Sequence, residues 1–375
     1  MKNKICVYAI CKNEKQFVEK WLESMKEADY IVVLDTGSTD GTYEMLKADT
    51  RVYRVEQKVI TPWRFDTARN ESMKLAPEDA NILFSTDLDE LLEPGWADII
   101  REKWIDGQHI RGTYKYAWSH DQDGQPTRIF KYDKLHNRNW HWEAPVHEFL
   151  KSDIYNNEML NAHTLDLFTE KIFLHHYQDT TKPRNNYLPL LELREKEYPN
   201  EYYTKFYLAI AYFHTQQYDK SIKYLNIILN MQKADGNDNF ELAIAYLLLG
   251  NNYRVMLDID KALYYYNKAI AQDPSYRDPY VLAAQIFTEK HLYNLAIGYI
   301  EEALKKSYRH YSWAEGPEVW SNLPEVLLTV AYYYSGDAEK ALYYAEEALK
   351  KTPYDKHCQF NVDIIKKNLM VQRKL

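Results

Sequence analysis

The stretch that decides the fold of the first half of the chain is NILFSTDLDE, residues 81–90. It begins with a short, mostly apolar run of the kind found in a strand that is covered on both faces of a sheet. Two carboxylates, Asp87 and Asp89, follow this run at once. Three earlier runs have the same apolar character: ICVYAI (5–10), YIVVL (30–34) and RVYRV (51–55).

Helical spacing separates these apolar runs. Phe17, Trp21, Leu22 and Met25 form one apolar stripe after the first run, and residues 66–75 have a second helical pattern. Strands that alternate with helices predict an α/β fold, in which a mainly parallel sheet with right-handed crossovers is flanked by helices. Ligands of such sheets bind beyond the carboxyl ends of the strands.

Strands and loops dominate the next part of the chain, from about residue 109 to residue 176. We expect strands over residues 111–118, 127–132 and 171–175. Aromatic residues and histidines are concentrated in residues 139–148, NWHWEAPVHE. This segment is therefore a candidate for the loop that carries chemistry.

The chain after about residue 185 is expected to be all helical, with an internal repeat. The small and aromatic residues have the spacing of a tetratricopeptide unit: Gly250, Tyr253, Ala262, Ala269 and Pro274. The pattern returns after 34 residues at Ala284, Ala296 and Ala303, and again at Ala341, Ala348 and Pro353 after an insertion of about 11 residues near 308–317. A weaker unit, with Ala209, Tyr212 and Ser221, comes first. We therefore predict an α/β domain over residues 1–184 and a tetratricopeptide-like repeat domain over 185–375.

Composition excludes several classes of protein. The 375 residues carry a formal net charge of −8, so no basic excess points to a nucleic-acid partner. No apolar run approaches the ~18 residues that span a bilayer, although peripheral contact with a membrane stays open. Three cysteines without metal-ligand spacing favour reduced thiols and hence a cytoplasmic protein.

Asp87 and Asp89 are the first candidate site. Two carboxylates one residue apart at a strand end can hold one divalent cation, Mn²⁺ or Mg²⁺, and leave positions for diphosphate oxygens. An acidic turn or helix start is the alternative explanation. His175 and His176 end the last predicted strand, where they must face opposite sides, so at most one can join the cation; we expect His176.

Asp35 and Arg69 are the next candidates. Asp35 leaves a strand near the sheet edge, where its carboxylate could accept a hydrogen bond from a base or a ribose hydroxyl, or could serve the start of the next helix. Arg69 could bind a phosphate, or could form a structural ion pair with Asp35 or Asp87. The residues alone leave both choices open.

Glu148, Glu143 and His147 are the candidates for acid–base chemistry. A carboxylate on a loop near the cation could deprotonate an acceptor, and Glu148 comes first for this role, with Glu143 second. His147 could orient the acceptor or the base, or could be an ordinary hydrogen-bonded loop histidine. Pro145 restrains the loop between the two glutamates.

Several of these segments together resemble the family 2 glycosyltransferases of the GT-A fold. The resemblance rests on AICKNE (9–14), VLDTGSTDGT (33–42), FDTARN (65–70) and DLDE (87–90). The later VHE (146–148) and LHHY (174–177) are similar to the branch with lipopolysaccharide-core glucosyltransferases and glycocin peptide S-glycosyltransferases, some of which also carry helical repeats. The resemblance covers roughly residues 4–180.

This resemblance implies a nucleotide-sugar donor, usually a UDP-sugar, and transfer with inversion. It implies a diphosphate-bound metal at Asp87 and Asp89 and an acidic base on the later loop. The expected donor contacts are Ile10, Asn13, Glu14, Asp35, Arg69 and Asp87. The repeats are expected to recognise a protein or peptide acceptor, or else to support the first domain or form a dimer interface. A lipopolysaccharide or other cell-surface glycan acceptor, and a non-catalytic repeat scaffold, remain as alternatives.

Overall fold

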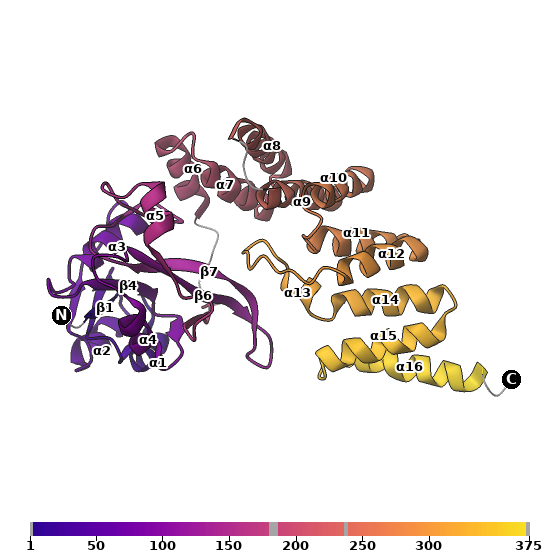
Figure 1. Cartoon of the computed structure of the whole chain (residues 1–375), viewed down its shortest axis with the longest axis horizontal. Coiled ribbons are helices and arrows are strands. Elements are labelled where there is room, and N and C mark those ends of the chain that lie inside the picture. The colour runs from indigo at the N-terminus through magenta and orange to yellow at the C-terminus, as the bar shows by residue number, and fades with distance from the viewer. Residues whose placement is uncertain (1–2, 180–186, 236–238, 373–375) are drawn as a thin grey trace. The chain divides into compact units, whose positions relative to one another are not determined.

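The computed structural model describes residues 3–179, 187–235 and 239–372, and the chain divides into two compact units. The first unit comprises residues 1–199 with 311–313, and the second comprises 200–310 and 314–375. Figure 1 shows that strands belong to the first unit, whereas the described part of the second is built of helices. This order confirms the predicted fold class, an α/β domain followed by helical repeats.

The strands of the first unit are short and closely follow the apolar runs. They are β1 (Ile5–Cys11), β2 (Tyr30–Asp35), β3 (Arg54–Gln57), β4 (Ile82–Asp87), β5 (Glu90–Leu92), β6 (Arg111–His120), β7 (Pro126–His136), β8 (His141–Glu143), β9 (Phe149–Lys151), β10 (Thr164–Asp166) and β11 (Phe173–His176). Among the described residues, nine of them form one sheet in the order β3-β2-β1-β4-β7-β6-β11-β5, with β10 beside β6. β8 and β9 pair separately as a two-stranded sheet.

Strand pairing in the large sheet is mixed but mainly parallel. β1 lies between β2 and β4 and is parallel to both, while β3 continues the parallel half beyond β2. β7 pairs antiparallel with β4 and β6, and β5 pairs antiparallel with β11. Because β1, β2 and β4 run the same way, their carboxyl ends meet at one edge, where Asp35 and Asp87 stand in register with Cys11 and Ile10.

Helices cover both faces of this sheet. The first unit contains α1 (Lys15–Met25), α2 (Thr42–Ala48), α3 (Phe65–Met73), α4 (Trp96–Lys103), α5 (Asn157–His163) and α6 (Tyr187–Glu197). Alternate residues of β1 belong to two separate hydrophobic clusters. Ile5, Val7 and Ala9 pack with α1 and α4, whereas Cys6, Tyr8 and Ile10 pack with α3. The period of two therefore sends neighbouring side chains of a fully buried strand to different helical layers.

The third predicted strand begins later than the sequence indicates. Residues 51–53 precede β3 because the chain turns there, with Val52 N–H donating to Asp49 O and Arg51 N–H donating to the Asp49 carboxylate. The hydrogen bonds of this turn compete with strand pairing. Strands β5, β8, β9 and β10 and helix α5 were not predicted, since each is short and has no clear periodicity.

The second unit consists of antiparallel helix pairs, as the repeats predict. Its helices are α7 (Tyr202–His214), α8 (Tyr218–Asp235), α9 (Asn239–Val255), α10 (Ile259–Gln272), α11 (Asp278–Glu289), α12 (Tyr293–Leu304), α13 (Pro317–Trp320), α14 (Leu323–Tyr334), α15 (Ala338–Lys351) and α16 (Lys356–Gln372). The inserted residues lie between α12 and α14 and include α13. Gly250 shows why small residues recur, because a Cβ there would lie 2.4 Å from the Tyr266 ring of the paired helix.

The division between the units falls after helix α6, later in the chain than the predicted boundary at residue 184/185. This helix groups with the first unit, where Arg194 and Glu197 make polar contacts with residues of the α/β domain. Within the described residues, no helix is long and apolar enough to span a bilayer.

Candidate functional site

The carboxyl end of β4 presents a set of charged side chains. Asp87 is the last residue of the strand, Leu88 is buried in the core, and Glu90 begins β5. Buried Leu88 anchors the turn, so that the carboxylates on either side of it are held at the sheet edge. This geometry follows from the sequence pattern that predicted the site.

Asp87 is bound by two cations. Arg69 Nη1 lies 3.0 Å from Oδ1, and Arg69 Nη2 donates to Oδ2 at 3.1 Å, while Lys134 Nζ lies 3.4 Å from Oδ2. Burial alone would raise the pKa of Asp87, but the charges of Arg69 and Lys134 outweigh it and hold that pKa well below its usual range. Of the two alternatives for Arg69, the ion pair with Asp87 is therefore present. From the sequence, we expect Asp87 to contact the divalent metal and the nucleotide sugar. In this structure both of its carboxylate oxygens contact Arg69 or Lys134.

Arg69 links Asp87 to Glu148. Its side chain is only 4% exposed, and its Nε donates to Glu148 Oε1 while Nη1 donates to Ser85 Oγ at 3.1 Å. The guanidinium also lies over the Trp142 ring, 5.3 Å from its centroid. Helix α3 and the loop before β9 are thus joined at the end of β4. The structure brings together Arg69, Asp87 and Glu148, which the sequence analysis named as candidates.

Lys134 and Glu90 belong to the same cluster and were missed by the sequence analysis. Lys134 on β7 is 5% exposed and lies 3.6 Å from Glu90 Oε1. Glu90 accepts hydrogen bonds from Tyr116 O–H at 2.8 Å and from Asp87 N–H at 2.9 Å. Burial raises the pKa of Glu90 against the opposing charge of Lys134. The sequence around Lys134 does not indicate that this lysine is buried. Its burial becomes evident only from the pairing of β7 with β4.

Asp89 and His176 form a second contact at this edge. Asp89 Oδ2 lies 3.3 Å from His176 Nε2, and His176 Nδ1 lies 3.3 Å from the Trp118 carbonyl, to which it can only donate. Burial would lower the pKa of His176, but the hydrogen bond and charge of Asp89 raise it. His175 faces elsewhere, toward His120 and Glu93, as the alternation of strand residues predicts.

The Asp89–His176 pair fits a divalent cation of the expected kind. The hydrogen bond that His176 Nδ1–H donates to the Trp118 carbonyl fixes the ring and leaves Nε2 to bind a metal. Metal-binding histidines usually make a second contact of this kind. Carboxylate and imidazole together suit Mn²⁺, and sites of this kind leave further positions for phosphate oxygens. No group of three or more His, Cys, Asp or Glu side chains in the described part of the chain is arranged to hold a metal by itself.

Asp35 shapes the loop after β2. It is fully buried, and its Oδ1 accepts from Gly37 N–H at 2.9 Å, Ser38 N–H at 2.7 Å and Gln57 Nε2 at 3.0 Å. Burial would raise the pKa of Asp35, but these hydrogen bonds hold it below the ordinary value. The carboxylate therefore builds the loop in this structure. Its other oxygen, Oδ2, accepts from Cys11 Sγ at 3.5 Å, so a nucleoside contact at Oδ2 would have to share it with this thiol.

The loops after β1 and β2 are tied to each other. Asn13, which has a positive φ of 53°, donates through its N–H to Ser38 Oγ at 2.8 Å and accepts from Thr39 N–H through Oδ1. Glu14 N–H donates to Thr42 Oγ1 at 2.9 Å. Ile10 is buried beneath these loops and is in register with Asp87. Asn13 and Glu14, two of the residues expected at the donor, thus lie on a loop that is hydrogen-bonded to the loop after β2.

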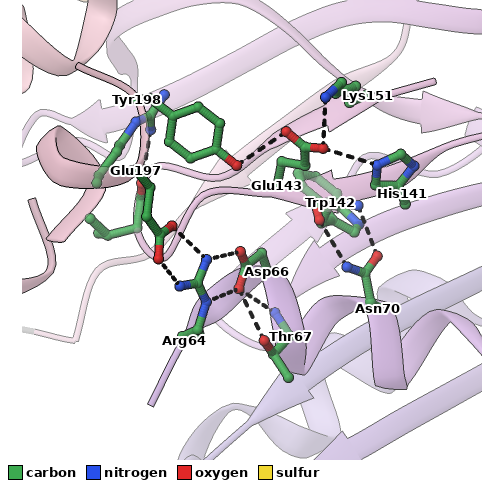
Figure 2. A network of polar contacts seen from close by, with 12 residues as sticks. Arg64, Asp66, Thr67, Asn70, His141, Trp142, Glu143, Lys151, Glu197 and Tyr198 are labelled. Carbon is green, nitrogen blue, oxygen red and sulfur yellow. Dashed lines mark hydrogen bonds and ion pairs between the residues drawn. The ribbon is translucent and has the colours of Figure 1, made fainter. Parts of the chain in front are cut away.

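Glu143 lies in a different polar network, which Figure 2 shows. It accepts from Lys151 Nζ at 2.9 Å and Tyr198 O–H at 3.1 Å, and lies 3.2 Å from His141 Nε2. Burial would raise the pKa of Glu143, but these hydrogen bonds lower it. These three partners differ from those of Asp87, which are Arg69 and Lys134. His147, the remaining candidate, is an exposed loop residue with a positive φ of 48° whose ring lies 6.3 Å from that of Tyr187.

Comparison with known proteins finds a family match in each unit. Residues 6–173 match the family "Glycosyl transferase family 2", and residues 202–275 match "Tetratricopeptide repeat". A curated relative, the lipopolysaccharide core biosynthesis glycosyltransferase LpsC of Rhizobium meliloti (strain 1021), is 28% identical over 108 residues, which are 29% of this chain and 40% of that protein. The chain thus matches less than half the length of this relative.

Solved structures that resemble the chain include helical repeat proteins. The crystal structure of MamA is 20% identical, with a TM-score of 0.37, and the match covers 47% of this chain and 95% of that one. The Arabidopsis OM64 TPR domain is 17% identical, with a TM-score of 0.30, and the match covers 35% and 98%. At these scores the likenesses add nothing to the family match.

Proposed function

We propose, from the match of residues 6–173 to glycosyltransferase family 2, that the chain transfers a sugar from a nucleotide sugar to an acceptor. The observation that carries this proposal is the contact of Arg69 with both Asp87 and Glu148, beside the Asp89–His176 pair. Side chains for a cation, for a diphosphate and for a base are thereby close to one sheet edge. We propose a UDP-sugar donor and transfer with inversion.

Asp89 and His176 are the proposed ligands of Mn²⁺ or Mg²⁺. When bound, the cation neutralises charge on the leaving diphosphate. Arg69 and Lys134 keep Asp87 ionised and oriented. Asp87 can then accept a hydrogen bond from the nucleotide sugar and leave the metal to Asp89 and His176. In this proposal Asp89 binds the metal and Asp87 contacts the nucleotide sugar.

Glu148 is the proposed base. Inverting transfer in one step needs a group that removes the proton of the acceptor as the sugar leaves its diphosphate. Arg69 donates to Glu148, whose side chain is 10% exposed, and orients it toward the end of β4. Glu143 is the weaker candidate because three donors already bind it.

The acceptor is proposed to be a protein or peptide that the helical repeats recognise, because arrays of this family form extended binding surfaces. A second candidate, a core oligosaccharide or other cell-surface glycan, is favoured by the name of the curated relative. The cytoplasm is the proposed location, which agrees with three buried cysteines that form no disulfide. Offering both acceptor classes with the identified donor, and weighing the products by mass spectrometry, separates them.

Donor binding tests the proposal directly. Calorimetric titration with UDP-glucose, UDP-N-acetylglucosamine, UDP-galactose and GDP-mannose, with and without Mn²⁺, should find one donor whose binding needs the metal. Asp89→Ala should abolish this binding. The control is Asp98→Ala, on the outer side of α4 with a side chain 91% exposed, which should bind normally. Failure of the folded wild type to bind any donor would favour a non-catalytic repeat scaffold.

A further inference from the structure

The loop from Ala144 to Glu148, between β8 and β9, has an unusual backbone. Ala144 and His147 have φ values of 82° and 48°, a region that residues with a side chain seldom adopt. Ala144, Pro145 and Val146 are buried, so their carbonyl groups lie away from water. A conformation of this kind persists only when neighbouring groups hold it and satisfy its polar atoms.

Two helices supply the donors that this loop needs. Phe65 N–H, at the start of α3, donates to Pro145 O at 3.0 Å. Arg194 Nη1, from α6, donates to Val146 O at 2.8 Å and to His147 O. Arg194 is 2% exposed, and its guanidinium lies 5.4 Å from the centroid of the Phe149 ring. One buried arginine therefore binds the two carbonyls that immediately precede Glu148.

Helix α6 is anchored a second time, at its C-terminal end. Figure 2 shows Glu197 paired with Arg64 and Tyr198 donating to Glu143. These contacts attach the helix to α3 and to β8 but do not touch the backbone before Glu148. In the same helix, Arg194 contacts the loop that carries Glu148, whereas Glu197 does not.

We propose that Arg194 is a positioning residue for the transfer reaction. It fixes the backbone in front of Glu148, while Arg69 fixes the carboxylate of Glu148 itself. Guanidinium suits this task because one planar group can donate to two neighbouring oxygens and stays charged when buried. The inference rests on the proposed function, in which Glu148 is the base. A shift of about 1 Å in such a group can cost roughly 10²-fold in rate.

Arg194→Met tests the inference, because methionine keeps much of the buried volume and removes every donor. We expect donor affinity in the calorimetric titration to stay within about twofold, while kcat for metal-dependent donor hydrolysis falls by at least about tenfold. Added guanidinium chloride should restore part of this rate in Arg194→Ala. Arg194→Lys, which retains one cationic donor group, should fall between wild type and Arg194→Met.

Glu197→Gln is the matched control on the same helix. It breaks the ion pair with Arg64 and leaves the contacts of Arg194 in place, so kcat should stay at the wild-type value. Amide hydrogen exchange over residues 144–149 gives a readout that needs no activity: it should accelerate in Arg194→Met and not in Glu197→Gln. If Arg194→Met proves unstable, the comparison of Arg194→Lys with Glu197→Gln serves instead.

Wild-type kcat in Arg194→Met, or an equal loss in Glu197→Gln, would overturn the positioning role. Unchanged exchange of the loop in Arg194→Met would do the same. A wild type that binds no donor would instead contradict the proposed function, and the exchange experiment would still decide whether Arg194 holds the loop. The two failures are therefore distinguishable.

Discussion

Two glutamates from one short segment, Glu143 and Glu148, enter very different surroundings. Glu148 meets Arg69, whose side chain is 4% exposed, whereas Glu143 meets Lys151, whose side chain is 48% exposed. Glu148 is joined through Arg69 to the strand-end Asp87, while Glu143 is joined through Tyr198 to the end of α6. One network lies at the sheet edge, and the other ties structural elements together.

The difference shows that burial of the partner, more than the presence of a carboxylate, separates a candidate active site from a structural contact. A buried cation has no water to replace a lost carboxylate, so its partners are firmly held. An exposed lysine can be solvated at little cost, so its ion pair contributes little. Three ways of testing this contrast follow from the geometry.

Replacing the two glutamates should give the largest contrast. Glu148→Gln is expected to lower kcat for metal-dependent donor hydrolysis by roughly 10²–10⁴-fold, because it removes the proposed base. Glu143→Gln should change kcat by less than about threefold, since its partners lie in the other network. Steady-state kinetics at saturating donor measure both. The reverse result would make Glu143 the base.

Removing the cationic partners should separate the networks by stability. Arg69→Met is expected to destabilise the first unit by about 3–5 kcal/mol, because Glu148 loses its buried cationic partner and Asp87 is left with Lys134 alone. Lys151→Met should cost about 0–1 kcal/mol, since half of the side chain is already in water. Urea unfolding followed by near-ultraviolet circular dichroism gives the two free energies. Equal losses would contradict the contrast.

Glu143 should make a small, pH-dependent contribution. Burial would raise its pKa, but hydrogen bonds from Lys151, His141 and Tyr198 hold it below the ordinary 4.5. A carboxyl group whose pKa is lowered by folding adds stability above pH 4.5, and this stability is lost as the pH falls through the lower folded value. At pH 7, Glu143→Gln should therefore be about 1 kcal/mol less stable than wild type. Thermal unfolding between pH 7 and pH 3 should show this difference shrinking below pH 4.5; a constant difference would exclude the charge as its cause.

The order of elements could be predicted from the sequence because it depends on local patterns. Apolar runs gave β1, β2 and β4, and the 34-residue spacing of small residues gave the paired helices around Gly250 and Ala262. The third strand was placed too early because the side chain of Asp49 captures Arg51 in a turn, which periodicity does not register. Short strands such as β8 were not predicted because three residues are too few to show a period of two.

The candidate site was only partly predictable. Asp87 and Asp89 are revealed by their place after an apolar strand, and the separation of His175 from His176 follows from strand alternation. The ion pair of Asp87 with Arg69 depends on the packing of α3 against the sheet, and the burial of Lys134 beside Asp87 depends on pairing between β4 and β7. Nothing near Lys134 in the sequence signals a buried charge.

The sequence by itself determined the two architectures and the edge at which chemistry is expected, because strand and helix periods are local and parallel strands share their carboxyl ends. Only the tertiary structure decided which carboxylate each cation holds and which arginine supports the loop before Glu148. Arg69 and Arg194 meet that loop from α3 and α6, which are far apart in the chain. Contacts of this kind arise when the hydrophobic core fixes the elements around it, and no local pattern encodes them.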